Sequence, residues 1–393
     1  MTHPTLDCWP HDVHQALLVG RIWQPGLGPV LVAARPEGLY DLSTLAPTCS
    51  ALLELPEVAA RVRAHIASGP SAALGSVADL LANSDEAQRD VQRPWLLAPC
   101  DLQAVKASGV TFVASMLERV IEEQARGDAS KAESVRRAVV AVIGENLRAV
   151  RPGSAEAAEL KRVLLEQGVW SQYLEVGIGP DAEIFTKAQP MSAVGHGAWV
   201  GLHPGSQWNN PEPEVVLAAN ARGEVVGATL GNDVNLRDFE GRSALLLGKA
   251  KDNNASCAIG PFIRLFDAHF GIDDVRQCEL NMQVQGPEGF ALSGRSSLAQ
   301  ISRDPLDLVA QAMGRYHQYP DGMVLFLGTM FAPTQDRHGP GQGFTHVVGD
   351  TVRIGTPALG QLFNRVTTSD QAPPWQYGAG ALMRDLARRG LLA

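Results

Sequence analysis

The chain has 393 residues, of which 45% are hydrophobic and 19% charged, and its formal net charge is −9. This balance is typical of a soluble globular protein and excludes a disordered or fibrous chain. The acidic charge argues against a nucleic-acid partner, because phosphate contacts need clustered Lys and Arg side chains. No apolar run is long enough to predict a membrane span. The lack of a secretory pattern and the five scattered cysteines favour a reducing, cytoplasmic compartment.

The first 95 residues are predicted to form a small N-terminal α/β domain. Two short apolar runs, 16–23 and 29–35, are separated by Pro and Gly residues, which predicts a β-hairpin. The pattern resets around Pro94, and we therefore expect a single large catalytic domain over residues 96–393.

After the predicted N-terminal domain, the chain changes from helical to strand-like patterns. Residues 111–127 have helical periodicity, with Phe112, Met116, Val120 and Ile121 on one side, and segments 129–150 and 155–167 continue as amphipathic helices. Beyond about residue 170, short apolar runs alternate with Gly, Pro and Asn turns, and residues 214–231 predict a hairpin. The expected fold class is α+β and β-rich, with helices inserted on the sheet structure.

Three carboxylates around this hairpin predict a metal site. Glu212 and Glu214 are two residues apart, so they share one face of a strand, and Asp233 follows the return strand. Three oxygen donors without His or Cys suit a hard cation, with Mg²⁺ preferred and Mn²⁺ also compatible. The alternative interpretation is a solvated acidic turn.

Lys251 follows in a segment rich in small and polar residues. A lysine beside a divalent metal has its pKa lowered by the like charge and by burial, so it can act as a base or stabilise an enolate. An exposed loop lysine is the alternative.

At this point the sequence resembles a known family, the fumarylacetoacetate hydrolases, over about residues 100–393. The resemblance is carried by an ordered set of motifs: Glu212-Pro213-Glu214, Asn232-Asp233-Val234, the segment from Lys251 to Pro261, Leu327-Gly328-Thr329 and Gly349-Asp350. It implies a mixed β-sandwich roll around a metal site, preceded by a small N-terminal domain, and assembly into homodimers or homotetramers.

The resemblance also indicates a branch within the family. Hydrolytic members carry a G-x-N-Y-x-x-H-x-x-E motif whose His and Glu activate water, whereas this chain has Ser115 at the histidine position and retains Glu118. A serine hydroxyl cannot act as a general base near neutral pH. The sequence is similar instead to a dehydratase branch that acts on 2-keto-3-deoxy sugar acids. That implies conversion of a 2-keto-3-deoxy-pentonate to 2-oxoglutarate semialdehyde by metal-stabilised enolate formation and loss of the C4 hydroxyl.

The resemblance, together with residue type, assigns expected roles. Lys251 and Glu183 are the expected catalytic base and acid. A 2-keto acid substrate is expected to contact five further residues, which are Thr329, Ser115, Phe112, Glu118 and Lys187. Arg119 is interpreted as a solvated helix residue.

Two alternatives stay open at the level of sequence. The first is a hydrolase of a 2,4-diketo acid, with Glu118, or His196 from another loop, activating water. The second is a catalytically silent protein that binds a sugar acid.

Overall fold

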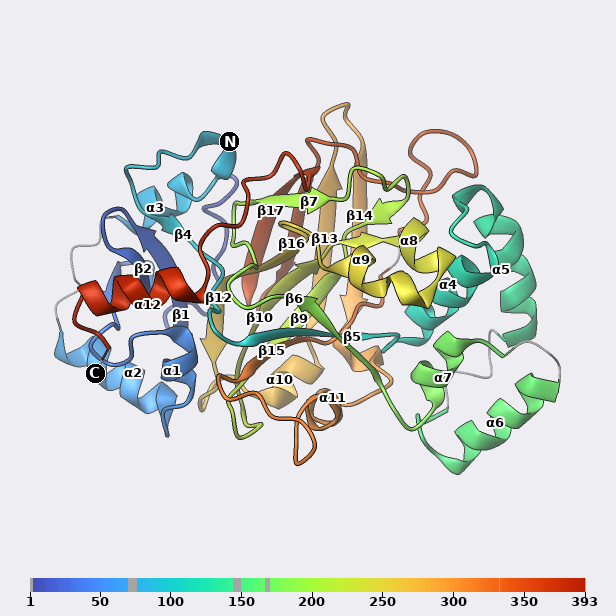
Figure 1. Cartoon of the computed structure of the whole chain (residues 1–393), viewed down its shortest axis with the longest axis horizontal. Helices are drawn as coiled ribbons and strands as arrows, with labels where there is room; N and C mark the ends of the chain where they lie inside the picture. The colour runs from blue at the N-terminus through green and yellow to red at the C-terminus, as the bar shows by residue number, and fades with distance from the viewer. Residues whose placement is uncertain (1–2, 70–75, 144–149, 167–169, 332, 393) are drawn as a thin grey trace.

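The computed structural model describes all residues except 1–2, 70–75, 144–149, 167–169, 332 and 393. Two β-sheets form the centre of the molecule, and helices gather at both ends of its long axis (Figure 1). The fold is α+β and β-rich, as the sequence predicts. Within the described residues, no helix is both long and apolar enough to cross a membrane.

The larger sheet has ten strands and carries the predicted hairpins. Its spatial order is β3 (Gly38–Asp41), β2 (Gly28–Arg35), β1 (Leu18–Gln24), β12 (Cys257–Leu265), β10 (Val225–Asp233), β9 (Pro213–Ala219), β15 (Met323–Phe326), β5 (Ala104–Gly109) and β6 (Glu183–Ala188), with β4 (Trp95–Leu96) paired to β1. The antiparallel pairs β1–β2 and β9–β10 confirm the hairpins predicted for residues 16–35 and 214–231.

The first 95 residues contribute strands to this same sheet. β1 pairs antiparallel with β12, so that Leu18 lies opposite Arg264. The carboxylate of Asp101 also accepts hydrogen bonds from the backbone N–H groups of Cys49 and Ser50. The sheet therefore continues without interruption from the N-terminal segment to the strands that carry the predicted metal site.

The second sheet packs against the first and encloses the main apolar core. It contains β14 (Ala291–Ser297), β13 (Glu279–Gln285), β16 (Thr351–Thr356), β17 (Gly360–Thr368) and β7 (Trp199–Leu202), and a separate short pair joins β8 (Asn209–Asn210) to β11 (Asn235–Leu236). Along β9, Val215 and Leu217 face the core between the sheets, while Val216 and Ala218 face the opposite side. Because β9 is buried on both faces, its position is tightly fixed.

Helices surround the sheets in separate groups. They are α1 (Cys49–Leu53), α2 (Val58–Ser68), α3 (Val77–Asn83), α4 (Val113–Gln124), α5 (Ala129–Ile143), α6 (Ala155–Glu166), α7 (Gln172–Ile178), α8 (Arg237–Arg242), α9 (Leu247–Lys251), α10 (Ile272–Arg276), α11 (Pro305–Ala312) and α12 (Ala379–Arg388), with short 3₁₀ turns η1 (Glu86–Gln88), η2 (Ala244–Leu246) and η3 (Leu298–Gln300). Helices α4–α7 lie at one end, and α1–α3 and α12 at the other (Figure 1).

The helical predictions agree with these elements where they can be compared. Met116, Val120 and Ile121 form the buried face of α4, as the periodicity predicts. α5 and α6 occupy most of the segments predicted as helical at 129–150 and 155–167. Residues 144–149 and 167 of those segments lie outside the described residues.

Candidate active site

The hairpin β9–β10 brings three buried carboxylates together. Glu212 immediately precedes β9, Glu214 lies in β9 opposite Gly231, and Asp233 ends β10. One oxygen atom from each of the three lies within 4.8 Å of the others. Their exposed fractions are only 7%, 2% and 1%, respectively. Because all three carboxylates are buried, the alternative interpretation as a solvated acidic turn is wrong.

Two buried lysines offset part of this negative charge. Lys251 Nζ lies 2.7 Å from Glu212 Oε2 and 3.0 Å from Asp233 Oδ2. Lys187 Nζ lies 2.9 Å from Asp233 Oδ1, and it also donates to the backbone carbonyls of Val234 and Lys251. Lys187 thus fixes the end of α9 against β10.

The negative charge that the two lysines do not offset acts most strongly on Glu214. Burial, followed by the charges of Asp233 and Glu212, raises the pKa of Glu214 well above its usual value. Burial also acts to raise the pKa of Asp233, but Lys187 and Lys251 outweigh it and hold that pKa low. A divalent cation among the three oxygens would supply the missing positive charge, and an all-oxygen donor set suits a hard cation. The residues therefore fit a metal such as Mg²⁺.

Glu183 approaches this cluster from the neighbouring part of the sheet. It begins β6 and pairs with Gly109 at the end of β5. Burial is the main cause that raises the pKa of Glu183, and the negative charges of Glu212 and Asp233 add to it against Arg119 and Lys251. Glu183 is therefore a carboxyl that tends to keep its proton near the metal ligands.

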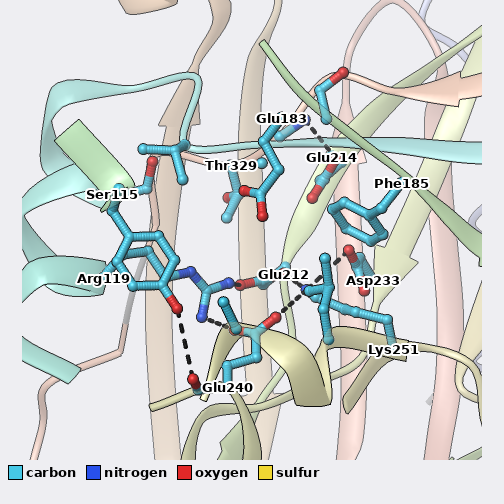
Figure 2. Close-up of a pocket in the computed structure, with 17 residues that line it drawn as sticks. Ser115, Arg119, Glu183, Phe185, Glu212, Glu214, Asp233, Glu240, Lys251 and Thr329 are labelled. Atoms are coloured by element: carbon cyan, nitrogen blue, oxygen red, sulfur yellow. Dashed lines mark hydrogen bonds and ion pairs between the residues drawn. The ribbon is translucent and has the colours of Figure 1, made fainter. Parts of the chain in front are cut away.

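Arg119 in α4 belongs to the site, so its interpretation as a solvated helix residue is wrong. Its guanidinium pairs with Glu122 at 2.8 Å and with Glu212 Oε1 at 3.1 Å, and it also pairs with Glu240. Figure 2 shows Arg119 pointing at Glu212 from the side opposite Lys251. Glu240 in α8 and Tyr173 in α7 line the same cavity and were also missed from sequence.

The cavity lined by these groups has a volume of about 40 Å³. Of the residues expected to act on substrate, Lys251, Glu183, Thr329 and Ser115 line it, together with the three metal-ligand candidates. Ser115 Oγ donates to the carbonyl of Phe112 within the first turn of α4. No histidine belongs to the lining within the described part of the chain.

Phe112, Glu118 and Lys187 do not line this cavity. Phe112 precedes the first turn of α4 and packs into the core between the sheets. Ser115 and Arg119 are four residues apart on α4, and both line the cavity. Glu118 instead pairs with Arg136 at 2.7 Å and with Arg237 at 3.0 Å.

Comparison with known proteins identifies the domain that contains this site. Residues 175–367 match the model of the fumarylacetoacetate (FAA) hydrolase C-terminal domain. That region is a fumarylacetoacetate hydrolase C-terminal domain. The matched residues include β9, β10 and α9, and therefore all three metal-ligand candidates and Lys251.

Two curated relatives have dehydratase names. A probable 2-keto-3-deoxyxylonate dehydratase of Haloferax volcanii is 30% identical over 203 residues, which are 52% of this chain and 66% of that protein. A 2-dehydro-3-deoxy-D-arabinonate dehydratase of Saccharolobus solfataricus is 31% identical over 155 residues, which are 39% of this chain and 51% of that protein. The aligned residues thus span less than two thirds of each relative.

Solved structures confirm the fumarylacetoacetate-hydrolase-like fold. The apo form of a 2-keto-3-deoxy-D-arabinonate dehydratase superposes with a TM-score of 0.60 at 20% identity, covering 89% of this chain and 99% of that one. The complex of a 2-keto-3-deoxy-D-arabinonate dehydratase with magnesium and 2,5-dioxopentanoate gives a TM-score of 0.59 at 19% identity, with the same coverage.

Proposed function

We propose that the protein is a Mg²⁺-dependent dehydratase that converts a 2-keto-3-deoxy-pentonate to 2-oxoglutarate semialdehyde. The observation that carries this proposal is the buried set of Glu212, Glu214 and Asp233 beside Lys251 and Glu183, in a cavity whose described lining contains no histidine. The names of the two curated relatives support the substrate class. 2-Oxoglutarate semialdehyde, the product proposed here, is the 2,5-dioxopentanoate bound in the related complex.

Glu212, Glu214 and Asp233 would hold the metal, and Mn²⁺ suits the same donors. A bound divalent cation would polarise the C2 carbonyl of the keto acid and offset the carboxylates that now keep Lys251 charged. Lys251 ends α9 with its Nζ directed at Glu212 and Asp233, and it would lie near the reacting carbons of a keto acid bound at these carboxylates. In the proposed mechanism, Lys251 removes the proton from C3.

Glu183 is suited to the second proton transfer. Because its pKa is raised by burial, it can deliver a proton to the C4 hydroxyl, which then leaves as water. Loss of a C5 proton and tautomerisation complete the aldehyde, so the net change is the loss of one water molecule. Thr329 and the neighbouring backbone would hold the substrate carboxylate at the other side of the cavity.

Metal and substrate binding would rearrange the ion pairs around Glu212. Arg119 and Lys251 both contact Glu212 and fill the space between the carboxylates. Metal and substrate together would replace these contacts.

A direct assay tests the proposal. The protein would be incubated with Mg²⁺ and a 2-keto-3-deoxy-pentonate, and in parallel with a 2,4-diketo acid. We expect the aldehyde product, measured through an aldehyde-dehydrogenase-coupled reaction, only from the first. Pyruvate release only from the diketo acid would instead establish a C–C hydrolase.

Two variants separate a metal-dependent enzyme from a silent binding protein. Glu214→Gln should abolish turnover, as should EDTA, whereas Glu224→Gln at an exposed position should retain it. Full turnover by Glu214→Gln would contradict the metal mechanism.

A further inference from the structure

A second, larger cavity lies away from the acidic cluster. Its volume is about 210 Å³, and it shares no lining residue with the 40 Å³ cavity around Glu214. It is formed where β1 and β4 meet segments 191–199 and 373–377. The first of these segments precedes β7, and the second leads into α12.

Aromatic side chains are concentrated in this cavity. Aromatic residues make up only 6% of the chain, yet four of its seven tryptophans line this one site. They are Trp23, Trp95, Trp199 and Trp375, accompanied by Tyr377. Trp23 and Trp95 stack with ring centroids 5.7 Å apart, and Trp23 meets Tyr377 edge-on at 5.2 Å. Packing in this way fixes the orientation of the rings before any ligand arrives.

The cavity is open to a ligand on one side. Trp375 is 47% exposed, although it is one of the largest apolar side chains. Its Nε1 donates a hydrogen bond to the backbone carbonyl of Tyr377, which restricts the position of the ring. The exposed face of Trp375 is therefore held in place and not merely loose at the surface.

A charged pair provides the polar end of the cavity. Arg89 Nη1 donates to Glu86 Oε1 at 2.7 Å, and Glu86 Oε2 accepts the backbone N–H of Trp199 at 2.9 Å. The guanidinium of Arg89 lies 5.0 Å from the ring centroid of Trp95, and its buried Nε has no hydrogen-bond partner. The lining also contains Arg21, so positive side chains outnumber Glu86 and a cationic ligand is disfavoured.

Backbone strain is located at the same place. Met191 has φ of 71° and Ala255 has φ of 59°, and both line the cavity. Non-glycine residues in the left-handed region cost free energy and persist where the surrounding structure holds them, which is a frequent property of ligand sites. Met191 is held there by a hydrogen bond from its N–H to the carbonyl of Asp101.

We propose that this cavity binds a single cyclic monosaccharide, either an aldose ring or an aldonolactone. The C–H groups on the face of a sugar ring carry partial positive charge and pack on the negative faces of tryptophan rings. Adjacent hydroxyls suit the planar Arg89–Glu86 pair, since one group donates and the other accepts. Apolar walls with a few polar groups at one end are the general composition of small-molecule sites. This site is separate from the proposed dehydratase site and does not depend on that assignment.

Isothermal titration of the full-length protein with D-xylose, L-arabinose, D-glucose and their lactones tests the proposal. We expect saturable binding of at least one of these sugars. Trp375→Ala, which truncates a half-exposed side chain, should weaken it about tenfold, the size expected for loss of one stacking partner. Trp170→Ala, at a tryptophan outside the cavity, should leave the affinity unchanged. Glu214→Gln should also leave it unchanged, because that residue lies in the other cavity.

Several results would overturn the proposal. One is the absence of saturable heat with all of these sugars. Another is binding that survives Trp375→Ala but is lost in Glu214→Gln, which would place the sugar at the acidic cluster. Binding of a planar aromatic anion such as indole-3-carboxylate, without binding of sugars, would assign a different ligand class. A change of oligomeric state in Trp375→Ala, measured by analytical ultracentrifugation, would show that a second copy of the chain covers the cavity.

Discussion

The carboxylate of Glu183 occupies the space that any side chain at position 109 would need. Gly109 and Glu183 lie opposite each other in the β5–β6 ladder, and a Cβ atom on residue 109 would overlap the Glu183 carboxylate. The glycine therefore allows the proposed acid to turn into the cavity while its own strand stays paired.

Replacing Gly109 with alanine should displace Glu183 and lower kcat. General acid catalysis contributes about 10²- to 10⁴-fold, so we expect a loss within that range, similar to that of Glu183→Gln. The measurement is steady-state turnover of the 2-keto-3-deoxy-pentonate, with Mg²⁺ affinity measured separately. Gly380→Ala, in the surface helix α12, is the matched control and should keep full activity. Equal kcat in Gly109→Ala and the parent protein would show that Glu183 is not the acid.

Glu214 should determine whether Mg²⁺ stabilises the protein. A ligand present at about 100 times its Kd stabilises the native state by about 2.7 kcal/mol. We expect a Mg²⁺-dependent increase of this order in the free energy of unfolding, measured by urea denaturation, and its loss in Glu214→Gln. Without metal, Glu214→Gln should be no less stable than the parent, because burial and the neighbouring carboxylates already disfavour the charged form of Glu214. An unchanged Mg²⁺ response in Glu214→Gln would contradict the proposed ligand set, and Glu224→Gln serves as the control.

Arg119 should be essential for stability as well as for the site. Replacing it with Met leaves Glu122 and Glu240 buried with fewer partners, although Arg237 and Lys251 remain nearby. Removing one partner of a buried ion pair typically costs about 3–5 kcal/mol. Arg162→Met is the matched control, since Arg162 pairs with Glu159 and Glu166 on an exposed helix face and such pairs contribute about 0–1 kcal/mol. Similar urea midpoints for the two variants would contradict the network in Figure 2.

Acidification should destabilise the fold through His196. Burial lowers its pKa from 6.5 to about 4. Its Nε2 lies 3.0 Å from the carbonyl of Thr5, and its Nδ1 accepts the backbone N–H of Phe363. Between these two pH values the unfolded chain binds a proton that the native protein does not, so stability falls as the pH decreases through this window. Over this pH window, the protonation of His196 should lower the free energy of unfolding by on the order of 3 kcal/mol.

Urea denaturation between pH 7 and 4 measures this effect. His196→Gln should reduce the slope of the unfolding free energy against pH by up to the amount that one bound proton contributes. The slope should not vanish, because burial lowers the pKa of His346 as well, against the opposing charge of Asp350. His269→Gln, at an exposed position, should leave the slope unchanged. An identical slope in His196→Gln and the parent protein would contradict the buried neutral imidazole.

The clustering of the three carboxylates could be predicted because residues close in the sequence bring it about. Glu212, Glu214 and Asp233 are joined by one hairpin, so strand periodicity and a short turn are enough to bring them together. The apolar pattern of α4 likewise identified Met116, Val120 and Ile121 as its buried face.

Arg119 could not be assigned in this way because its partners come from distant parts of the chain. Glu212 and Glu240 are 93 and 121 residues away, and only the folded sheet brings them to α4. A charged residue on a helix is normally solvated, so the local pattern favours the wrong environment. The aromatic cavity was missed for the same reason, since its tryptophans come from segments far apart in the sequence.

The pairing of β1 with β12 limits how the chain can be shortened. A protein beginning at residue 96 would leave residues 263–265 of β12 without their partners in and next to β1, beside the hairpin that carries Glu214 and Asp233. Unpaired edges of this kind recruit other chains and promote aggregation. The N-terminal segment therefore covers a sheet edge next to the hairpin that carries the carboxylates, and a fragment chosen by motif boundaries alone should accumulate in inclusion bodies.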